Sequence, residues 1–284
     1  ASSSVMPLYM DAAQLGMKNS ANEETLGKDK VDRHKDTKHY DVDQYGVVTG
    51  YKGENTNLVF PEKKYGKKIC EIGQGAFQNQ KDICSVVLPE GVEEIGKDAF
   101  FNCTSLVSIE FPDTLSVIGL GAFQNCIQLQ RIDLSKTNIT RIPEGAFQNC
   151  RNLVEVILPK GLCSIEANAF YSCGNLKNFY LANLKKLTKI GSGAFSGCSG
   201  LTSVEIPSSV TEIGESAFEG CSGLTSIKIP SSVTRIGNYA FYGSIGLTSV
   251  EIPSSVTEIG DYAFSGYSGL TSVKILSSVT EIGR

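Results

Sequence analysis

The residues of this 284-residue chain best suited to acid–base, nucleophilic or metal chemistry are two histidines and nine cysteines. His34 and His39 lie in one densely charged stretch, and their spacing suits no standard helix-face metal pair. No histidine follows His39, so no serine or cysteine of the rest of the chain has a histidine to act as its base. The glycines match neither a phosphate-binding loop nor a dinucleotide fingerprint. We therefore expect no enzymatic activity, no metal and no cofactor.

The cysteines form a pattern of their own, because six of the nine follow a phenylalanine by three residues. Other copies of this position hold Gln80, Ser244 and Tyr267. A position that accepts Cys or Ser is a small buried slot, in which a free thiol behaves as a small hydrophobe. Neighbouring copies about 5 Å apart would also permit disulfides, whereas a single file of thiols has no tetrahedral site for zinc. We expect reduced, buried thiols at Cys103, Cys126, Cys150, Cys173, Cys198 and Cys221.

The spacing of these cysteines follows a repeat that runs through most of the chain. The pair Ala-Phe occurs nine times, first at Phe77 and last at Phe264, at intervals of 23 to 25 residues. A period of this length indicates one supersecondary unit repeated along an axis. Each unit buries its apolar face only against its neighbours, so the sequence predicts a solenoid.

One unit, Leu224–Ser244, shows the elements expected in each coil: LTSIKIPSSVTRIGNYAFYGS. Its first residues alternate between polar and apolar side chains, which predicts a strand that Pro230 ends. The V-T-R-I stretch alternates again and predicts a second, shorter strand, after which Gly237 permits a turn. The remaining N-Y-A-F-Y-G predicts a single helical or 3₁₀ turn. Stacked coils are expected to form parallel β-ladders in a right-handed superhelix.

Three parts are expected along the chain. Residues 1–41 lack a hydrophobic period and are dense in mixed charge, which is typical of a flexible segment. Residues 42–65 predict a hairpin that caps the first coil, whose end is otherwise an open sheet edge. Residues 66–284 hold about nine repeats of about 23 residues, the last truncated, because a further Ala-Phe is due just after Arg284. The start lacks an initiator Met and a signal sequence, which indicates a trimmed chain.

Charge and hydropathy limit the partners. The formal net charge of −4 argues against nucleic acid and anionic membrane surfaces as main partners. No segment approaches about 18 consecutive apolar residues, so we expect no membrane insertion.

The repeat resembles a known family. The elements LTSVEIP, VTEIG and AF-x-x-C at 23-residue spacing, with the lead-in DQYGVVTGY…LVFP, are similar to the BspA-like leucine-rich repeats over residues 42–284. The resemblance implies a leucine-rich-repeat solenoid whose long strands line one face. It also implies an extracellular or cell-surface protein that adheres to host matrix or to other cells. The middle copies depart from the pattern at residues 135–137 and 182–184, where the proline is lost.

The outward side chains of the long strands locate the candidate site. In the late repeats they alternate between Glu and Lys, as at Glu205 and Lys228, and such pairs contribute about 0.2–1 kcal/mol each along a ladder. The middle repeats instead mix apolar and charged residues, and exposed apolar side chains near arginine are typical of protein-binding sites. The expected ligand-binding residues are Val87, Glu110, Arg131, Asp133, Glu155, Ile157, Asn178 and Tyr180.

Two functions remain open at this point. The first is a binding module that attaches to host matrix or cell-surface protein through the strand-lined face. The second is a structural spacer array within a larger cell-wall protein, with no ligand of its own, which the near-identical late repeats favour. Drift in a tolerant repeat, or cover by the N-terminal segment, would also produce the irregular middle strands. The sequence names neither the ligand nor the oligomeric state.

Overall fold

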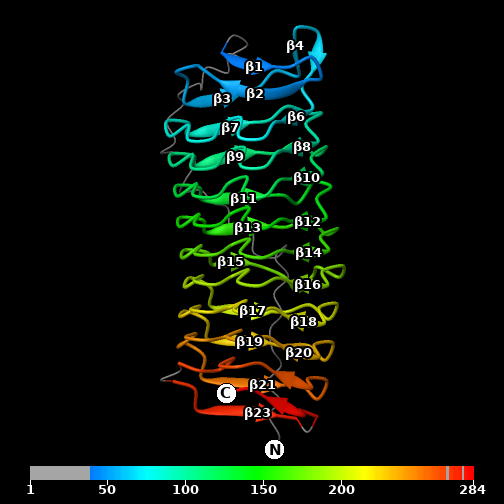
Figure 1. Ribbon diagram of the computed structural model, residues 1–284, viewed down its shortest axis with the longest axis vertical. Coiled ribbons are helices and arrows are strands. Elements are labelled where there is room, and N and C mark those ends of the chain that lie inside the picture. The colour runs from blue at the N-terminus through cyan, green and yellow to red at the C-terminus, as the bar shows by residue number, and fades with distance from the viewer. Residues whose placement is uncertain (1–38, 267–268, 277) are drawn as a thin grey trace, which may run out of the picture. The chain divides into compact units, whose positions relative to one another are not determined.

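The computed structural model describes residues 39–266, 269–276 and 278–284. The segment 1–41, expected to be charged and flexible, lies almost wholly outside the described residues, as do His34 and the repeat position Tyr267. Within the described part the chain winds into coils that stack along one axis (Figure 1). Most coils carry one longer and one shorter strand, and consecutive coils pair in parallel. The predicted solenoid with parallel ladders is therefore confirmed.

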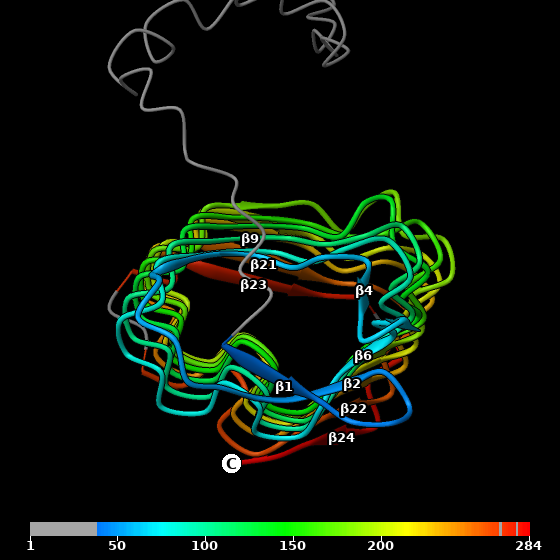
Figure 2. The same cartoon turned by 90° about the horizontal axis from the view of Figure 1, so that it is seen from above.

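The longer strands lie on one side of the coils and the shorter strands on another, as the view along the axis shows (Figure 2). The longer strands are β3 (Asn57–Val59), β7 (Ser85–Val87), β9 (Ser108–Glu110), β11 (Arg131–Asp133), β13 (Glu155–Ile157), β15 (Asn178–Phe179), β17 (Ser203–Glu205), β19 (Ser226–Lys228), β21 (Ser249–Ile252) and β23 (Ser272–Ile275). The shorter strands are β6 (Glu71–Ile72), β8 (Glu94–Ile95), β10 (Val117–Ile118), β12 (Arg141–Ile142), β14 (Ser164–Ile165), β16 (Lys189–Ile190), β18 (Glu212–Ile213), β20 (Arg235–Ile236), β22 (Glu258–Ile259) and β24 (Glu281–Ile282).

The two sides differ in continuity. On the short-strand side the hydrogen-bonded order is broken once, between β10 and β12, and one sheet of seven strands then runs from β12 to β24. On the long-strand side the hydrogen-bonded order is broken between β9 and β11, between β15 and β17, and between β19 and β21. The long-strand face is therefore the less uniform of the two surfaces.

The core is built from columns of identical residues. Phe77 and Phe100 stack with ring centroids 5.0 Å apart and planes within 7°, and the column continues coil by coil to Phe218 and Phe241 at 5.6 Å. These rings are fully buried. Every coil places the same apolar column against the next, so the rings pack through contacts between neighbouring coils alone.

The stretch around each Ala-Phe pair differs from the expected helical turn, because it forms consecutive β-turns. In one coil Ala99 and Phe101 donate N–H bonds to carbonyls three residues earlier, while Phe100 donates to Ala122 of the next coil at 2.8 Å. Asp98 and Asn102 have φ of 53° and 61°. A residue with positive φ cannot continue a right-handed helix, so the segment forms turns. Every second N–H of the segment therefore donates along the solenoid axis to the next coil rather than within its own coil. This turn side thus supplies a third row of bonds between coils.

The cysteine column is fully buried, and all nine cysteines of the chain are free thiols. Each column thiol also donates a hydrogen bond to the carbonyl of the phenylalanine in the preceding coil, as from Cys126 to Phe100 at 3.2 Å. Ser244 makes the same bond to Phe218 at 2.7 Å. The slot is therefore defined by a donor requirement as well as by size, which explains why Ser replaces Cys there.

Four further strands form the N-terminal end: β1 (Tyr40–Val42), β2 (Val47–Tyr51), β4 (Lys63–Lys64) and β5 (Lys67–Lys68). β1 and β2 form an antiparallel hairpin, and β2 pairs in parallel with β6, so this hairpin covers the edge of the short-strand sheet. The division into segments 1–41, 42–65 and 66–284 remains a proposal. Among the residues that are described, no helix has the length and apolar character needed to cross a bilayer.

Candidate functional site

The candidate site is the outward face of strands β7 to β15. Side chains in a strand alternate between its faces, and the buried positions are Val86, Ile109, Ile132 and Val156, so their neighbours point outward. The degree of exposure differs among the predicted residues. Glu110, Arg131 and Tyr180 are exposed, whereas Val87, Asp133, Glu155 and Ile157 are half-buried; Asn178 lies at the start of β15.

Strand register decides which of these residues meet. Arg131 is opposite Glu155, and Asp133 is opposite Ile157. Because Val156 pairs with Phe179, Ile157 and Tyr180 occupy the next matching positions of adjacent coils. The side chain of Tyr180 is 74% exposed.

Val87 stands apart from that apolar pair. It pairs with Glu110 on β9, and the charged positions of β11 lie between it and Ile157. The sequence predicted one mixed patch. The structure divides it into an apolar pair, Ile157 and Tyr180, beside a charged centre on β11.

Arg131 is the hub of the charged centre. Its Nε donates to Glu155 Oε2 at 2.7 Å, and its Nη2 donates to Asp133 Oδ2 at 3.0 Å. The bond to Glu155 is the main cause of a raised pKa for Arg131. Burial alone would raise the pKa of Asp133, but hydrogen bonds from Ser135 and the charge of Arg131 hold it below the usual value. The guanidinium is thus fixed in place and stays charged.

A shallow hollow of about 520 Å³ opens next to this centre. It lies where β9 and β11 are not hydrogen-bonded neighbours. Ser135, Lys136 and Thr137 form its rim in place of the usual proline corner, and Thr137 Oγ1 donates to Leu134 O at 2.8 Å. The lining residues are Ser108, Ile109, Glu110, Phe111, Arg131, Asp133, Ser135, Lys136 and Thr137.

Sequence reasoning missed Phe111 and Lys136 as parts of the site. The lost proline at residues 135–137 was noted as a departure from the repeat, and it was the available signal for a reshaped corner. The break in hydrogen bonding between β9 and β11 had no such signal, because both strands keep the ordinary 23-residue spacing.

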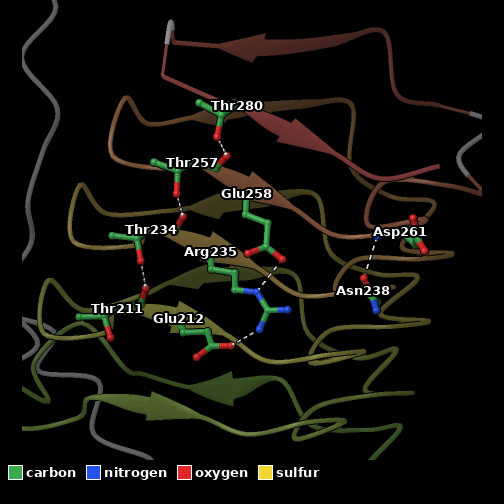
Figure 3. A network of polar contacts seen from close by, with 9 residues as sticks. All are labelled: Thr211, Glu212, Thr234, Arg235, Asn238, Thr257, Glu258, Asp261 and Thr280. Carbon is green, nitrogen blue, oxygen red and sulfur yellow. Dashed lines mark hydrogen bonds and ion pairs between the residues drawn. The ribbon is translucent and has the colours of Figure 1, made fainter.

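The late coils present a contrasting surface, shown in Figure 3. Arg235 donates to both Glu212 and Glu258 at 2.9 Å. Threonines of successive coils form a ladder, in which Thr257 Oγ1 donates to Thr234 O at 3.3 Å. On the long-strand side, Lys274 pairs with Glu251 at 3.4 Å. The polar groups of these coils therefore bond chiefly to their own neighbours along the stack.

Two observations describe the chemical character of the acidic, histidine and cysteine side chains. Within residues 39–266, 269–276 and 278–284, no three His, Cys, Asp or Glu side chains are placed to hold a metal ion. Burial raises the pKa of the column thiols, of Cys103 to about 12 for example, which keeps them protonated and unreactive. The site offers instead a fixed charge network, an exposed tyrosine and a shallow hollow.

Comparisons with known proteins concern the repeat and the fold. The sequence profile of the BspA type leucine rich repeat region matches residues 70–199 and 188–284, in six copies. The solved leucine rich repeat protein of T. pallidum is 29% identical, with a TM-score of 0.53, over 74% of this chain and 88% of that chain. A leucine rich cell surface protein from Faecalibacterium prausnitzii A2-165 is 25% identical, with a TM-score of 0.40, over 86% of this chain and 88% of that chain. A search of curated proteins found no match.

Proposed function

The chain belongs to the BspA type leucine-rich repeat family, and from this membership we propose that it is a cell-surface or secreted binding module. In this proposal the module adheres to a host matrix or cell-surface protein through the long-strand face of the middle coils. It acts without catalysis and without a cofactor. Its location outside the cell is part of the proposal, and it rests on the surface or secreted character that the family resemblance implies.

One observation carries the proposal: the exposed ring of Tyr180 lies at the position next to half-buried Ile157, beside the fixed charges of Arg131 and Glu155. Tyrosine gives a large contact area with little loss of conformational freedom, and arginine and tyrosine are enriched among residues that dominate binding energy. Because Arg131 is already held by two carboxylates, a partner would not have to order it.

The test compares two double variants for binding to a solubilised extracellular-matrix extract and to its purified components. Ile157→Asp with Tyr180→Asp removes the apolar anchor and adds negative charge beside Glu155. Loss of one such anchor costs about 2 kcal/mol or more of binding, roughly thirtyfold in affinity. Since Ile157 is half-buried, the single variant Tyr180→Ala, at an exposed position, guards against a folding defect.

The matched control is Glu251→Ser with Lys274→Ser, an exposed ion pair on the regular half of the same face. This control should change affinity by less than about threefold, because exposed ion pairs contribute little. If the control pair weakens binding as much as the middle pair, the late coils carry recognition and the proposal is wrong.

The second candidate function is a structural spacer within a larger cell-wall protein. In the late coils the Glu–Lys pairs and the threonine ladder form their bonds between neighbouring coils of the same chain. This favours a spacer function for the C-terminal half of the molecule. If neither double variant affects any interaction that the wild type makes, the spacer function gains and the binding proposal loses.

A further inference from the structure

The hairpin of β4 and β5 concentrates positive charge that the acidic chain as a whole does not have. Its sequence is Lys63-Lys64-Tyr65-Gly66-Lys67-Lys68. Lys63, Lys67 and Lys68 are exposed, and none of them has an ion-pair partner among the residues that the structure describes. The ring of Tyr65 at the tip is 83% exposed.

The strand pairing places like charges face to face. Lys63 is opposite Lys68, and Lys64 is opposite Lys67. Like charges directly opposite each other destabilise an antiparallel pair. The tip adds a second unfavourable feature, because Tyr65 has φ of 51°, a left-handed conformation in which a bulky residue is strained. A two-residue hairpin turn requires φ > 0 at both central residues, here Tyr65 and Gly66, so the conformation itself follows from the turn. What the turn does not explain is the choice of tyrosine, where Asn or Gly fits with less strain, and of lysines in opposed positions.

The hairpin is nevertheless held firmly. The ammonium group of Lys64, which is only 6% exposed, donates to the carbonyl of Tyr40 and lies 4.4 Å from the centroid of the Tyr40 ring. It also lies 5.2 Å from the Tyr65 ring, so a cation–π contact positions the tip. The Ile69 N–H closes the stem on Glu62 O at 2.9 Å. One lysine therefore anchors the hairpin. The other three remain exposed, and the end of the Lys68 side chain lies against Gly91 of the next coil.

A second exposed aromatic side chain stands beside the stem. Tyr45, 73% exposed, precedes Gly46, whose Cα lies so close to the carbonyl of Lys68 that a Cβ there would clash with it. Cys70 N–H donates to Gly46 O at 3.1 Å and fixes this turn against the hairpin. The cap thus presents three ammonium groups with a tyrosine at the tip and another near the base.

From these observations we propose that the β4–β5 hairpin is a binding site for a linear sulfated polysaccharide. Ammonium groups are compact point charges that suit sulfates spread along a flexible chain. Tyrosine supplies an apolar face for a sugar ring while its hydroxyl stays in water. This site lies on the N-terminal cap and is separate from the proposed protein-binding face of the middle coils, so it does not depend on that proposal.

Two other polyanions fit less well. Nucleic acids favour the planar, bidentate fork of arginine, which the hairpin lacks. An anionic bilayer favours a broader apolar face inserted below the charges, whereas the tip carries only Tyr65 between hydrophilic residues.

The experiment measures binding of the full chain to a heparin-derived oligosaccharide at about 0.05 M and about 0.15 M salt. Binding is measured in the same way to three comparison ligands: the desulfated oligosaccharide, a single-stranded oligonucleotide of equal charge, and vesicles that contain an anionic lipid. One triple variant changes the three exposed hairpin lysines to Gln. The matched triple removes the same number of charges from exposed lysines of three separate coils. The hairpin variant is Lys63→Gln, Lys67→Gln and Lys68→Gln, and the control is Lys81→Gln, Lys160→Gln and Lys177→Gln.

We expect the hairpin triple to weaken heparin binding by at least about tenfold, and the control by less than about threefold. The Tyr65→Ala variant should lose several-fold while keeping the salt dependence of the wild type, because it removes packing and no charge. Desulfation should abolish binding.

The proposal is overturned if the wild type does not bind the oligosaccharide at the lower salt, or if both triples weaken it equally. It is also overturned if the oligonucleotide or the vesicles bind more tightly than the sulfated sugar. If the wild type does not bind the oligosaccharide at all, the lysines only protect the hairpin edges from pairing with other chains.

Discussion

Replacement of Cys173 tests why the cysteine column exists. The Cys173 thiol is fully buried and donates to the carbonyl of Phe147 at 3.2 Å. If the slot only required a small apolar side chain, Ala would replace Cys well and Ser poorly. If the slot requires a donor, the order is reversed, and the geometry predicts that reversed order.

The magnitudes follow from the contacts. A hydroxyl buried without a partner costs about 1–3 kcal/mol. Ser244 shows that a hydroxyl in this column finds the phenylalanine carbonyl at 2.7 Å, so Cys173→Ser should cost only about 1 kcal/mol. Cys173→Ala removes the donor and leaves a small void, while the Phe147 carbonyl keeps its bond from the Cys150 N–H. We expect about 1–2 kcal/mol for this change. Cys173→Val loses the donor and overpacks the slot, for about 2–3 kcal/mol.

Urea unfolding followed by circular dichroism measures the three variants against the wild type. The midpoints should fall in the order Ser, Ala, Val with an unchanged slope, because the surface exposed on unfolding is the same. A serine variant less stable than the alanine variant would refute the donor requirement and restore the view that the column is merely small and apolar.

Two further predictions concern the same core. Phe170→Ala should cost about 3–5 kcal/mol, measured by the same unfolding assay, because it leaves a cavity between the stacked rings of two neighbours. Burial raises the pKa of Cys221 from 9.0 to about 12, so above pH 9 this thiol ionises only in the unfolded chain. Its contribution is complete below pH 9 and is lost as pH rises toward 12, at about 1.4 kcal/mol per pH unit. Cys221→Ser should make alkaline destabilisation shallower by that amount, and an unchanged slope would contradict the buried, protonated thiol.

The solenoid could be predicted because its stability is local. Each coil buries the same columns against the next, so the Ala-Phe period and the alternation of short strands carry the whole pattern. The length of the segment around Phe100 did not show whether it forms a helical turn or consecutive β-turns. Its conformation depends on the hydrogen bonds that it makes to the next coil. The residues with positive φ did hold a signal, because Asn recurs at Asn79, Asn102, Asn125 and Asn149, and Asn tolerates that conformation.

The placement of the candidate residues on the strands was predicted in outline and not in detail. Alternation along each strand correctly placed Arg131 and Tyr180 on the outer face. It could not show that Val87 and Ile157 are half-buried, because their exposure depends on side chains of adjacent coils. The basic hairpin was missed for a different reason: an overall charge of −4 conceals a local cluster of four lysines.

The separation of core and surface explains how such a chain acquires binding sites. Substitution of Phe170 disturbs rings in both neighbouring coils, so the core columns are constrained by their repetition. An outward residue such as Tyr180 contributes little to that packing and is free to change coil by coil. Sites of this kind should therefore lie where outward residues break the repeat while the inward columns keep it. The outward residues of β11 and the hairpin at Tyr65 depart from the repeat in this way. In the late coils, where Arg235 is bonded between two glutamates, the outward residues repeat as regularly as the inward columns. Under the proposed function, recognition and stability depend on different residues, and variants of the long-strand face of the middle coils should alter affinity at little cost in folding.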